Sequence, residues 1–293
     1  MMNMNCFGRN LITASSSLPL VQIAAQKEAH FWYVLPNEVK STNLLNRYLE
    51  ILSPCEKENV FHMRGEQLTK RALLTRVLVR TTLARYQMNC QINPKSLKFR
   101  TNNYGKPEEW VDLLYTDDWS PPPLHFNISH TSSLIAYGVT VGSPIGIDVE
   151  EKQRALKNDI LTFARRYLSP QEIEMPTHIA DHELQRQEFI KLWTLKINEA
   201  YVKAQGKGFS ASPFKIFTVQ LRDHMEGGIH IPPHMISKNL SSNWQFVLLE
   251  LAGSHYAVVC IGKDRINTGK GSIPINLTIR KTIPFVEDEC ILQ

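Results

Sequence analysis

The stretch FIKLWTLKINEAYVKAQGKGF, residues 189–209, constrains the fold of this chain more than any other segment. Its apolar residues recur at steps of three and four, which is the spacing of one face of an α-helix. They are Phe189, Leu192, Trp193, Ile197, Ala200, Tyr201 and Ala204. Because such a stripe is stable only when it is covered, we predict a helix that packs against a core and ends at Gly206 and Gly208.

The same stretch carries charges beside its apolar stripe. Lys196, Glu199 and Lys203 gather on one flank, and Glu199 and Lys203 are neighbours because they are four residues apart. The stretch alone leaves two interpretations open. It is either an amphipathic helix with a solvated ion pair, or a helix that presents a carboxylate and an ammonium group to a ligand.

The composition is that of a folded protein with an anionic partner. The chain has 293 residues, of which 43% are hydrophobic and 21% charged, so it can bury a substantial core. No run is apolar enough to cross a membrane. The net charge of +5 favours a phosphorylated ligand, an acidic protein or nucleic acid. Nucleic acid ranks last, because the basic residues are dispersed instead of interleaved with aromatic ones on one surface.

The order of elements predicts an α+β fold with two similar halves. A long helix over residues 66–86 precedes strands over residues 96–100, 124–128 and 134–141, and a strand over residues 145–150 follows at the start of the second half. In the second half, the helix within residues 189–209 precedes strands over residues 215–221, 244–251 and 255–261, and the last two form a hairpin. We therefore expect each half to pack a long helix on a small, mainly antiparallel sheet, and the halves to be related by a pseudo-twofold axis.

The chain divides into four segments on this interpretation. They are a leader over residues 1–28, an N-terminal half over residues 29–143, a C-terminal half over residues 144–263, and a tail of unknown structure over residues 264–293. The leader is acid-free up to Lys27 and rich in serine, so it is either a transit peptide or a disordered start. Five scattered cysteines indicate free thiols in a reducing compartment. We expect a soluble intracellular protein, in the cytosol or, with a transit peptide, in the mitochondrial matrix or another organelle.

The strand IGIDVE, residues 145–150, is the second informative segment. Side chains alternate along a strand, so Asp148 and Glu150 share one face at a separation of roughly 7 Å. Two such carboxylates repel each other unless a cation lies between them. Their hard oxygen ligands favour Mg²⁺, with substrate phosphates completing its coordination. The alternative is an edge strand with an acidic, solvent-facing side.

Two loops supply groups that can hold a phosphate. The first follows the strand that contains Asn127 and presents Ser129 and His130, which can donate hydrogen bonds to an anion. The second holds Lys106 between a glycine and a proline. Taken singly, each loop is also typical of an ordinary turn that binds nothing. The chain lacks the Ser-His-Asp order of hydrolases, a P-loop, a dinucleotide-binding glycine motif and the spacing of a zinc site.

Four motifs follow one another in the chain. The first three are Gly105–Pro107, Asn127–His130 and Gly146–Glu150, and the fourth consists of Trp193–Lys196 and Glu199–Gly208. Their order and spacing resemble the 4′-phosphopantetheinyl transferases, in the large, pseudo-dimeric class of the surfactin-synthetase-activating enzyme. The resemblance covers roughly residues 30–262. It implies transfer of the phosphopantetheine arm of coenzyme A to a serine of an acyl or peptidyl carrier protein, with release of adenosine 3′,5′-bisphosphate.

The resemblance also implies roles for individual residues. Asp148, Glu150 and Glu199 would bind Mg²⁺ against the pyrophosphate, and Glu199 would be the base for the attacking serine. Lys203 would neutralise charge that develops on the pyrophosphate. The nucleotide end of coenzyme A would be held by Arg71, Lys106, Ser129 and His130. Coenzyme A and an acidic carrier domain are the expected partners, with no membrane or nucleic acid, and we expect a monomer. The carrier is left open between fatty acid synthase, a mitochondrial acyl carrier and an aminoadipate-type reductase.

One departure from the family pattern bears on activity. In the family, a glutamate directly follows the lysine that matches Lys196, whereas Ile197 and Asn198 intervene here. Two extra helical residues rotate the preceding segment by about 200° relative to Glu199. Our hypothesis is that Glu199 still reaches the metal. The alternatives are a catalytically impaired variant that binds coenzyme A or a carrier protein, and an unrelated Mg²⁺-dependent phosphodiesterase.

Overall fold

The computed structural model describes residues 9–11, 19–21, 23, 28–86, 92–101, 107–108, 124–155, 159–196, 199–206, 244–262 and 276–292. Its α-helices are α1 (Thr42–Glu50), α2 (Pro54–Phe61), α3 (Glu66–Arg85), α4 (Ile160–Tyr167), α5 (Pro170–Thr177), α6 (His182–Lys196) and α7 (Glu199–Gln205). Short 3₁₀ turns lie at η1 (Pro36–Glu38) and η2 (Pro94–Ser96). The strands of the first part of the chain are β1 (Arg9–Leu11), β2 (Glu28–Val34), β3 (Arg100–Thr101), β4 (Pro107–Glu108), β5 (Leu124–His130), β6 (Ile135–Val141) and β7 (Ile145–Glu151). Those of the second part are β8 (Trp244–Leu251), β9 (His255–Gly262), β10 (Asn276–Ile283) and β11 (Glu287–Leu292).

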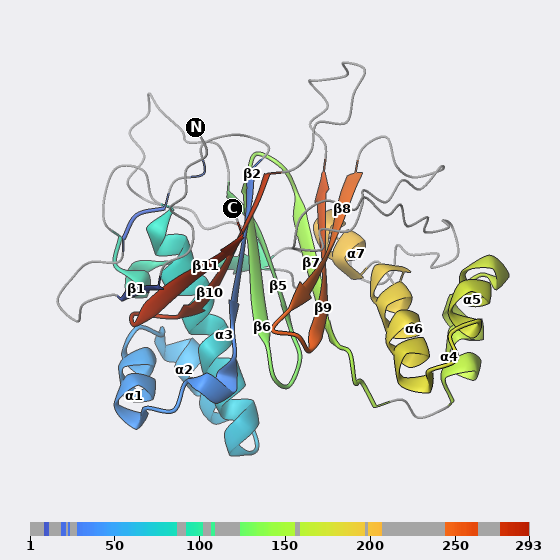
Figure 1. Ribbon diagram of the computed structural model, residues 1–293. Coiled ribbons are helices and arrows are strands. Elements are labelled where there is room, and N and C mark those ends of the chain that lie inside the picture. Colours follow the sequence, from blue (N-terminus) through green and yellow to red (C-terminus); the bar gives the residue numbers. More distant parts are fainter. Residues whose placement is uncertain are drawn as a thin grey trace.

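The strands form two main sheets and one short pair (Figure 1). The larger sheet has six strands in the order β1-β11-β10-β2-β6-β5, and the smaller has three in the order β7-β9-β8. Most neighbours are antiparallel, but β10 runs parallel to β2, with Asn276 opposite Glu28. The hairpin of β10 and β11 therefore completes a sheet whose other main strands lie far earlier in the chain.

The two sheets meet where the edge strand β5 lies beside the edge strand β7. Between these two edges, side chains of β5 take the place of the backbone hydrogen bonds that would join neighbouring strands of one sheet. Oδ1 of Asn127 accepts the backbone N–H of Ile147 at 2.9 Å, and Oγ of Ser129 accepts that of Val149 at 3.3 Å. Both the side chains and the N–H groups repeat every second residue, so the two bonds fit one strand face. They satisfy donors that a sheet edge otherwise leaves unpaired.

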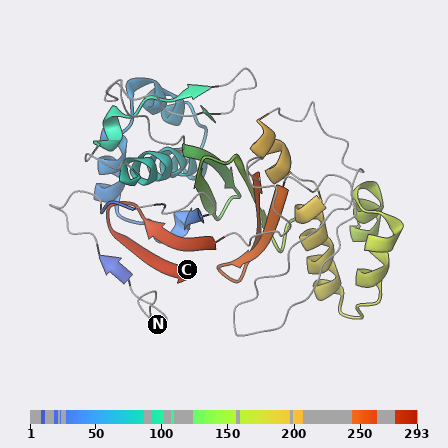
Figure 2. The same ribbon diagram turned by 90° about the horizontal axis from the view of Figure 1, so that it is seen from above.

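Helices α1, α2 and α3 cover one face of the six-stranded sheet (Figure 2). Strand β2 is buried on both faces, because Trp32 and Val34 pack toward these helices while Phe31 and Tyr33 pack toward the smaller sheet. Helix α2 begins with a capping box in which Ser53 and Glu56 bond each other's backbone N–H groups. This capping box fixes where α2 begins.

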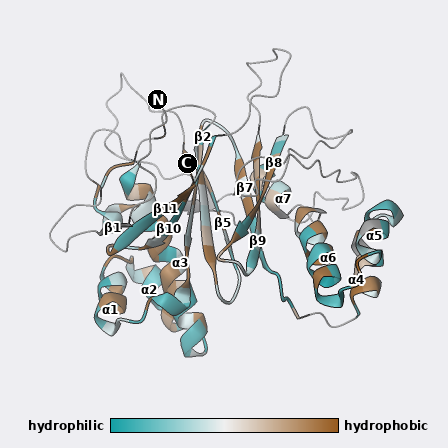
Figure 3. Cartoon of the chain, viewed as in Figure 1, coloured by the Kyte–Doolittle hydropathy of each residue, from teal (hydrophilic) through white to brown (hydrophobic). Residues whose placement is uncertain are grey.

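The smaller sheet is also buried on both sides. Ile145, Ile147 and Val149 of β7 enter the core between the two sheets. The opposite face of the smaller sheet carries α4, α6 and α7, whose core residues include Phe189 and Ala200. The sheets thus lie between two groups of helices (Figures 1 and 2). Hydrophobic residues run along the central strands, whereas much of α5 is hydrophilic (Figure 3).

The α+β class is confirmed, as are the long helix at residues 66–86 and the hairpin of β8 and β9. The strand predicted at residues 96–100 is wrong. Asn93 caps a 3₁₀ turn there, with its Oδ1 accepting the N–H of Lys95 at 3.0 Å, and β3 begins only at Arg100. The strand predicted at residues 215–221 lies outside the described residues. The pseudo-twofold relation stays a prediction, since the sheets have six and three strands.

The helix predicted within residues 189–209 corresponds to two helices, α6 and α7, and residues 197–198 between them lie outside the described residues. Helix α6 begins earlier than predicted, because Oδ1 of Asp181 accepts the N–H groups of Glu183 and Leu184 at 2.8 and 3.0 Å. In the described part of the chain, none of the helices has both the length and the apolar character needed to cross a membrane.

Candidate active site

Strand β7 carries the two predicted metal-binding carboxylates on one face. Asp148 and Glu150 are 7% and 8% exposed, although carboxylates are rarely buried without partners. Ile147 and Val149 lie on the opposite face, in the core between the sheets. The alternation predicted from the sequence is therefore observed. The acidic face is covered by the protein and is not an edge that faces solvent.

Helix α7 covers this acidic face because residue 146 is a glycine. A Cβ atom at Gly146 would lie 1.8 Å from the carbonyl oxygen of Ala200 and 2.5 Å from the backbone nitrogen of Ala204. Only a residue without a side chain permits this approach. The backbone of α7 therefore packs directly on the backbone of β7, and this contact fixes where Lys203 enters the site.

Lys203, Asp148 and Ser129 form a closed triangle of hydrogen bonds. Nζ of Lys203 lies 2.9 Å from Oδ1 of Asp148 and 3.1 Å from Oγ of Ser129. The Ser129 hydroxyl donates to Oδ1 of Asp148 at 3.0 Å and accepts the N–H of Val149. One donated and two accepted bonds use the full capacity of a hydroxyl group. Ser129 therefore orients both the carboxylate and the ammonium group.

Glu150 has a different environment. Arg154 donates from Nη1 to Oε2 of Glu150, and the N–H of Glu151 donates to Oε1 at 3.0 Å. Burial raises the pKa of Glu150, the negative charge of Asp148 raises it further, and the Arg154 guanidinium offsets only part of this effect. The guanidinium also lies over the ring of Trp193, 4.5 Å from its centroid. Glu150 is thus a carboxylate that would gain from additional positive charge.

A third group of residues lies at the end of β5. Nη1 of Arg71, from α3, donates to the carbonyl oxygen of Thr131 at 3.5 Å. Partial burial lowers the pKa of His130, and the charges of Arg71 and Lys203 lower it further. Because both cations act on His130, the end of β5 is a region of positive potential beside the two carboxylates.

Six of the predicted site residues therefore come together from four elements, and they are Arg71, Ser129, His130, Asp148, Glu150 and Lys203. Lys106 and the side chain of Glu199 lie outside the described residues. The backbone of Glu199 begins α7, one helical turn before Lys203.

The donor set of this face suits a hard divalent cation. Two buried carboxylates share one face of the strand, and burial keeps the pKa of Glu150 raised although the Arg154 guanidinium lowers it. Carboxylate oxygens are the ligands that Mg²⁺ prefers. Among the described residues, no group of three or more His, Cys, Asp and Glu side chains could hold a metal ion. A third protein ligand would have to come from a side chain such as that of Glu199.

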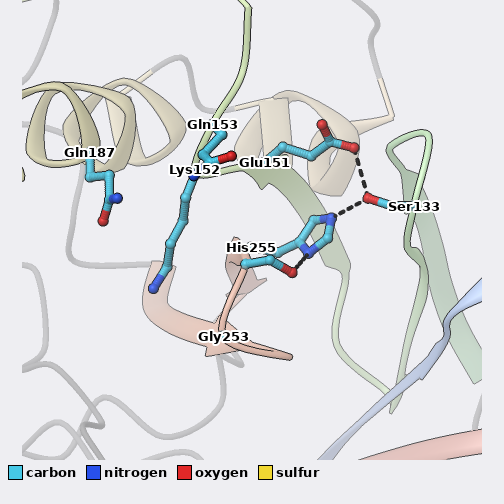
Figure 4. A pocket seen from close by; sticks show the side chains of 8 residues that line it. Ser133, Glu151, Lys152, Gln153, Gln187, Gly253 and His255 are labelled. Atoms are coloured by element: carbon cyan, nitrogen blue, oxygen red, sulfur yellow. Dashed lines mark hydrogen bonds between the residues drawn. The ribbon is translucent and has the colours of Figure 1, made fainter. Parts of the chain in front are cut away.

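A second polar cluster lies around the turn between β8 and β9, where a cavity of about 310 Å³ is lined by Ser133, Glu151, Lys152 and His255 among others (Figure 4). Ser133 bonds both Glu151 and His255, at 2.8 and 2.9 Å. Sequence reasoning missed this cluster, because a single histidine after a turn has no partner at a recognisable spacing. The residues come from three separate turns, which only the fold brings together.

The chemistry available to the first cluster is that of a polyphosphate site. The ammonium group of Lys203, the guanidinium of Arg71 and the imidazole of His130 can bind anionic oxygens. The buried carboxylates can hold a divalent cation, and a carboxylate near it can accept a proton from a hydroxyl group. Phosphoryl transfer depends mainly on such positioning and charge neutralisation.

Comparison with known proteins agrees with this chemistry. Residues 144–261 match the family model of the 4′-phosphopantetheinyl transferase superfamily. The chain is 31% identical over 186 residues to the 4′-phosphopantetheinyl transferase Sfp of Bacillus subtilis (strain 168). The aligned region covers 64% of this chain and 74% of that protein. It is 28% identical over 183 residues to the 4′-phosphopantetheinyl transferase HetI of Nostoc sp. (strain PCC 7120), covering 62% of this chain and 70% of that protein. Residues 144–261, which the family model matches, contain β7, α7 and all of β9 except its last residue.

Proposed function

This chain belongs to the 4′-phosphopantetheinyl transferase superfamily, and we propose that it transfers the 4′-phosphopantetheine group of coenzyme A to a serine of an acyl or peptidyl carrier protein. The observation that carries the proposal is the triangle of Lys203, Asp148 and Ser129 beside the buried carboxylate of Glu150. It supplies fixed opposite charges where a pyrophosphate would need them.

The reaction balances without a redox partner. The carrier serine oxygen forms a bond to the phosphorus atom that bears the pantetheine arm. The bond from that phosphorus to the bridging oxygen of the pyrophosphate breaks, and adenosine 3′,5′-bisphosphate leaves. The serine proton passes to a carboxylate, for which we propose Glu199, at the start of α7.

Residues from both sheets and from the helices α3 and α7 would contribute to binding and catalysis. Asp148 and Glu150, with Glu199, would hold Mg²⁺, which when bound neutralises charge on the pyrophosphate. Lys203 would stabilise the charge that develops on the leaving group, while Ser129 keeps it aligned with Asp148. The nucleotide end of coenzyme A would bind at the positive end of β5, through Arg71, Lys106, Ser129 and His130.

The intervening residues Ile197 and Asn198 lie outside the described residues. We propose an active transferase and not the catalytically impaired variant, for two reasons. Helix α7 after them holds Lys203 on Asp148 at 2.9 Å. The contact of α7 with Gly146 fixes this helix independently of α6. We therefore propose that the extra residues are absorbed before α7 and that Glu199 stays beside the metal.

The partner we propose is an acidic carrier domain, because the chain carries a net charge of +5. Coenzyme A is the second substrate. We propose that a monomer is sufficient, because β5 and β7 of one chain supply both sides of the site. For compartment we propose the cytosol, or the mitochondrial matrix if residues 1–28 are a transit peptide.

The proposal is tested by intact-mass spectrometry of an apo acyl carrier protein incubated with this protein, coenzyme A and Mg²⁺. We expect the carrier to gain one phosphopantetheine group, and the gain to be lost with EDTA, with Asp148→Asn and with Glu199→Gln. Glu188→Gln is the matched control, because Glu188 lies on α6 and bonds Lys191 at 3.2 Å, outside the site. Absence of any mass gain with the wild-type protein would overturn the proposal.

A further inference from the structure

His255, the first residue of β9, lies 2% exposed between three turns of the molecule (Figure 4). Its Nε2 atom is 2.9 Å from Oγ of Ser133 and 3.1 Å from Oγ1 of Thr131, both in the turn between β5 and β6. Its Nδ1 atom is 2.9 Å from Oγ of Ser254. A residue of the smaller sheet therefore bonds the turn that follows Ser129 and His130.

The neighbouring bonds define the direction of the hydrogen bond between Ser133 and His255. Ser133 donates its hydroxyl hydrogen to Oε1 of Glu151 at 2.8 Å, so its oxygen can accept a hydrogen from His255. Nε2 of His255 then carries the hydrogen, and in a neutral ring Nδ1 is the nitrogen without one, 2.9 Å from Oγ of Ser254. Burial lowers the pKa of His255, which agrees with a neutral ring. The ring thus donates to Ser133 of the turn between β5 and β6, while its other nitrogen faces Ser254 of the turn between β8 and β9.

The bonded turn is the anchor of the proposed nucleotide site. Thr131 closes the turn, since its Oγ1 accepts the N–H groups of Ser133 and Leu134 at 3.2 and 3.1 Å. The carbonyl oxygen of the same Thr131 accepts from Arg71. A displacement of Thr131 would therefore move both His130, the residue before it, and the contact that holds Arg71.

We propose that His255 is a positioning residue for coenzyme A, which from the smaller sheet holds the turn of residues 131–134 and so sets the placement of His130 and Arg71. This inference rests on the proposed function, because it requires that the end of β5 binds the nucleotide. His255 itself touches neither the carboxylates nor Lys203 through any bond among the described residues.

Three variants separate positioning from simple destabilisation. Asn at position 255 is too short to reach the turn, whereas the amide nitrogen of Gln can take the place of Nε2. The matched control is Thr140→Val, which removes a buried bond of 2.6 Å to the carbonyl oxygen of Ser143 at the opposite end of the same hairpin. The measurements are the Kd of coenzyme A by calorimetry and the KM and kcat of transfer.

We expect His255→Asn to raise the Kd and KM for coenzyme A about tenfold, the effect of losing about one net hydrogen bond, with kcat and the KM for carrier protein changed less than about threefold. His255→Gln should restore most of the affinity, and Thr140→Val should bind coenzyme A like the wild type. Unchanged affinity in His255→Asn, no recovery in His255→Gln, or equal weakening in Thr140→Val would each overturn the inference. Failure of the wild-type protein to bind coenzyme A would instead overturn the proposed function.

Discussion

The substitution Gly146→Ala tests how far the site depends on the contact of α7 with β7. The new Cβ atom would lie 1.8 Å from the carbonyl oxygen of Ala200, and an ordinary van der Waals contact begins at 3.4 Å. The obstacle is backbone, which cannot rotate away as a side chain does. Helix α7 must therefore retreat by about 1.6 Å at this point.

A shift of this size is enough to break the ion pair of Lys203 and Asp148. Nζ of Lys203 and Oδ1 of Asp148 are 2.9 Å apart, so the displacement takes them beyond hydrogen-bonding distance. Misplacement of a positioned group by 1 Å can cost about 100-fold in rate, so we expect kcat to fall about 100-fold or more. Overpacking should lower the free energy of unfolding by about 1–3 kcal/mol.

The assay is transfer to apo carrier protein followed by intact mass, together with urea unfolding. The control is Gly138→Ala, whose Cβ would meet side-chain atoms instead of backbone, namely Cγ2 of Ile147 and Cδ1 of Ile145 at 2.7 and 2.9 Å. Both isoleucines lie on the core face of β7, opposite Asp148, so this variant should lose stability but keep kcat within about threefold of the wild type. A Gly146→Ala enzyme with a wild-type rate, or a structure of it in which α7 has not moved, would refute the reasoning.

Three further predictions concern single side chains. Ser129→Ala removes bonds to Asp148, Lys203 and the N–H of Val149, so it should lower the free energy of unfolding by about 1–3 kcal/mol and slow transfer. The comparison is Ser132→Ala, which loses one exposed bond, to Oε1 of Glu151, and should cost less stability; equal urea midpoints for the two variants would be inconsistent with the role of Ser129. Burial raises the pKa of Glu150 above its usual 4.5, so ionisation costs stability as the pH rises through the folded-state pKa. Glu150→Gln should therefore raise the Tm of the metal-free protein at pH 7 while abolishing transfer, and an unchanged or lower Tm would contradict this. Burial lowers the pKa of His30 below 6.5, although Glu28 acts to raise it. The unfolded chain therefore takes up the proton first, and stability is lost as the pH falls from 6.5 through the folded-state pKa. The fall in unfolding free energy between pH 7.5 and 5 should be smaller in His30→Asn, and parallel curves would exclude this contribution.

Much of the site could be predicted because its residues lie in strong local patterns. The alternation in β7 places Asp148 and Glu150 on one face regardless of what covers that face. The helical spacing of α7 likewise places Lys203 one turn after Glu199. The extent of the long helix α3 and the hairpin of β8 and β9 follow from the same kind of periodicity.

The remainder depends on contacts between distant segments, which carry no local signal. Two of the three bonds of Ser129, to Asp148 and Val149, arise because β5 and β7 meet edge to edge, and a serine at the end of a strand does not reveal this. A glycine inside a strand indicates close approach by another segment, but only the fold shows that the segment on Gly146 is α7. The strand predicted at residues 96–100 failed because the capping side chain of Asn93 competes locally with an extended chain.

The parallel pairing of β10 with β2 has a consequence for synthesis on the ribosome. Asn276 pairs with Glu28, so the partner of β2 is translated 248 residues after it. At about 5–20 residues per second, the nascent chain waits on the order of 12 to 50 s before this edge of β2 can be covered. During that interval, this edge of a strand that is buried in the folded protein exposes its N–H and C=O groups to other chains. Expression yield should therefore depend on chaperones that bind nascent chains, and a truncation before residue 276 would make that exposure permanent.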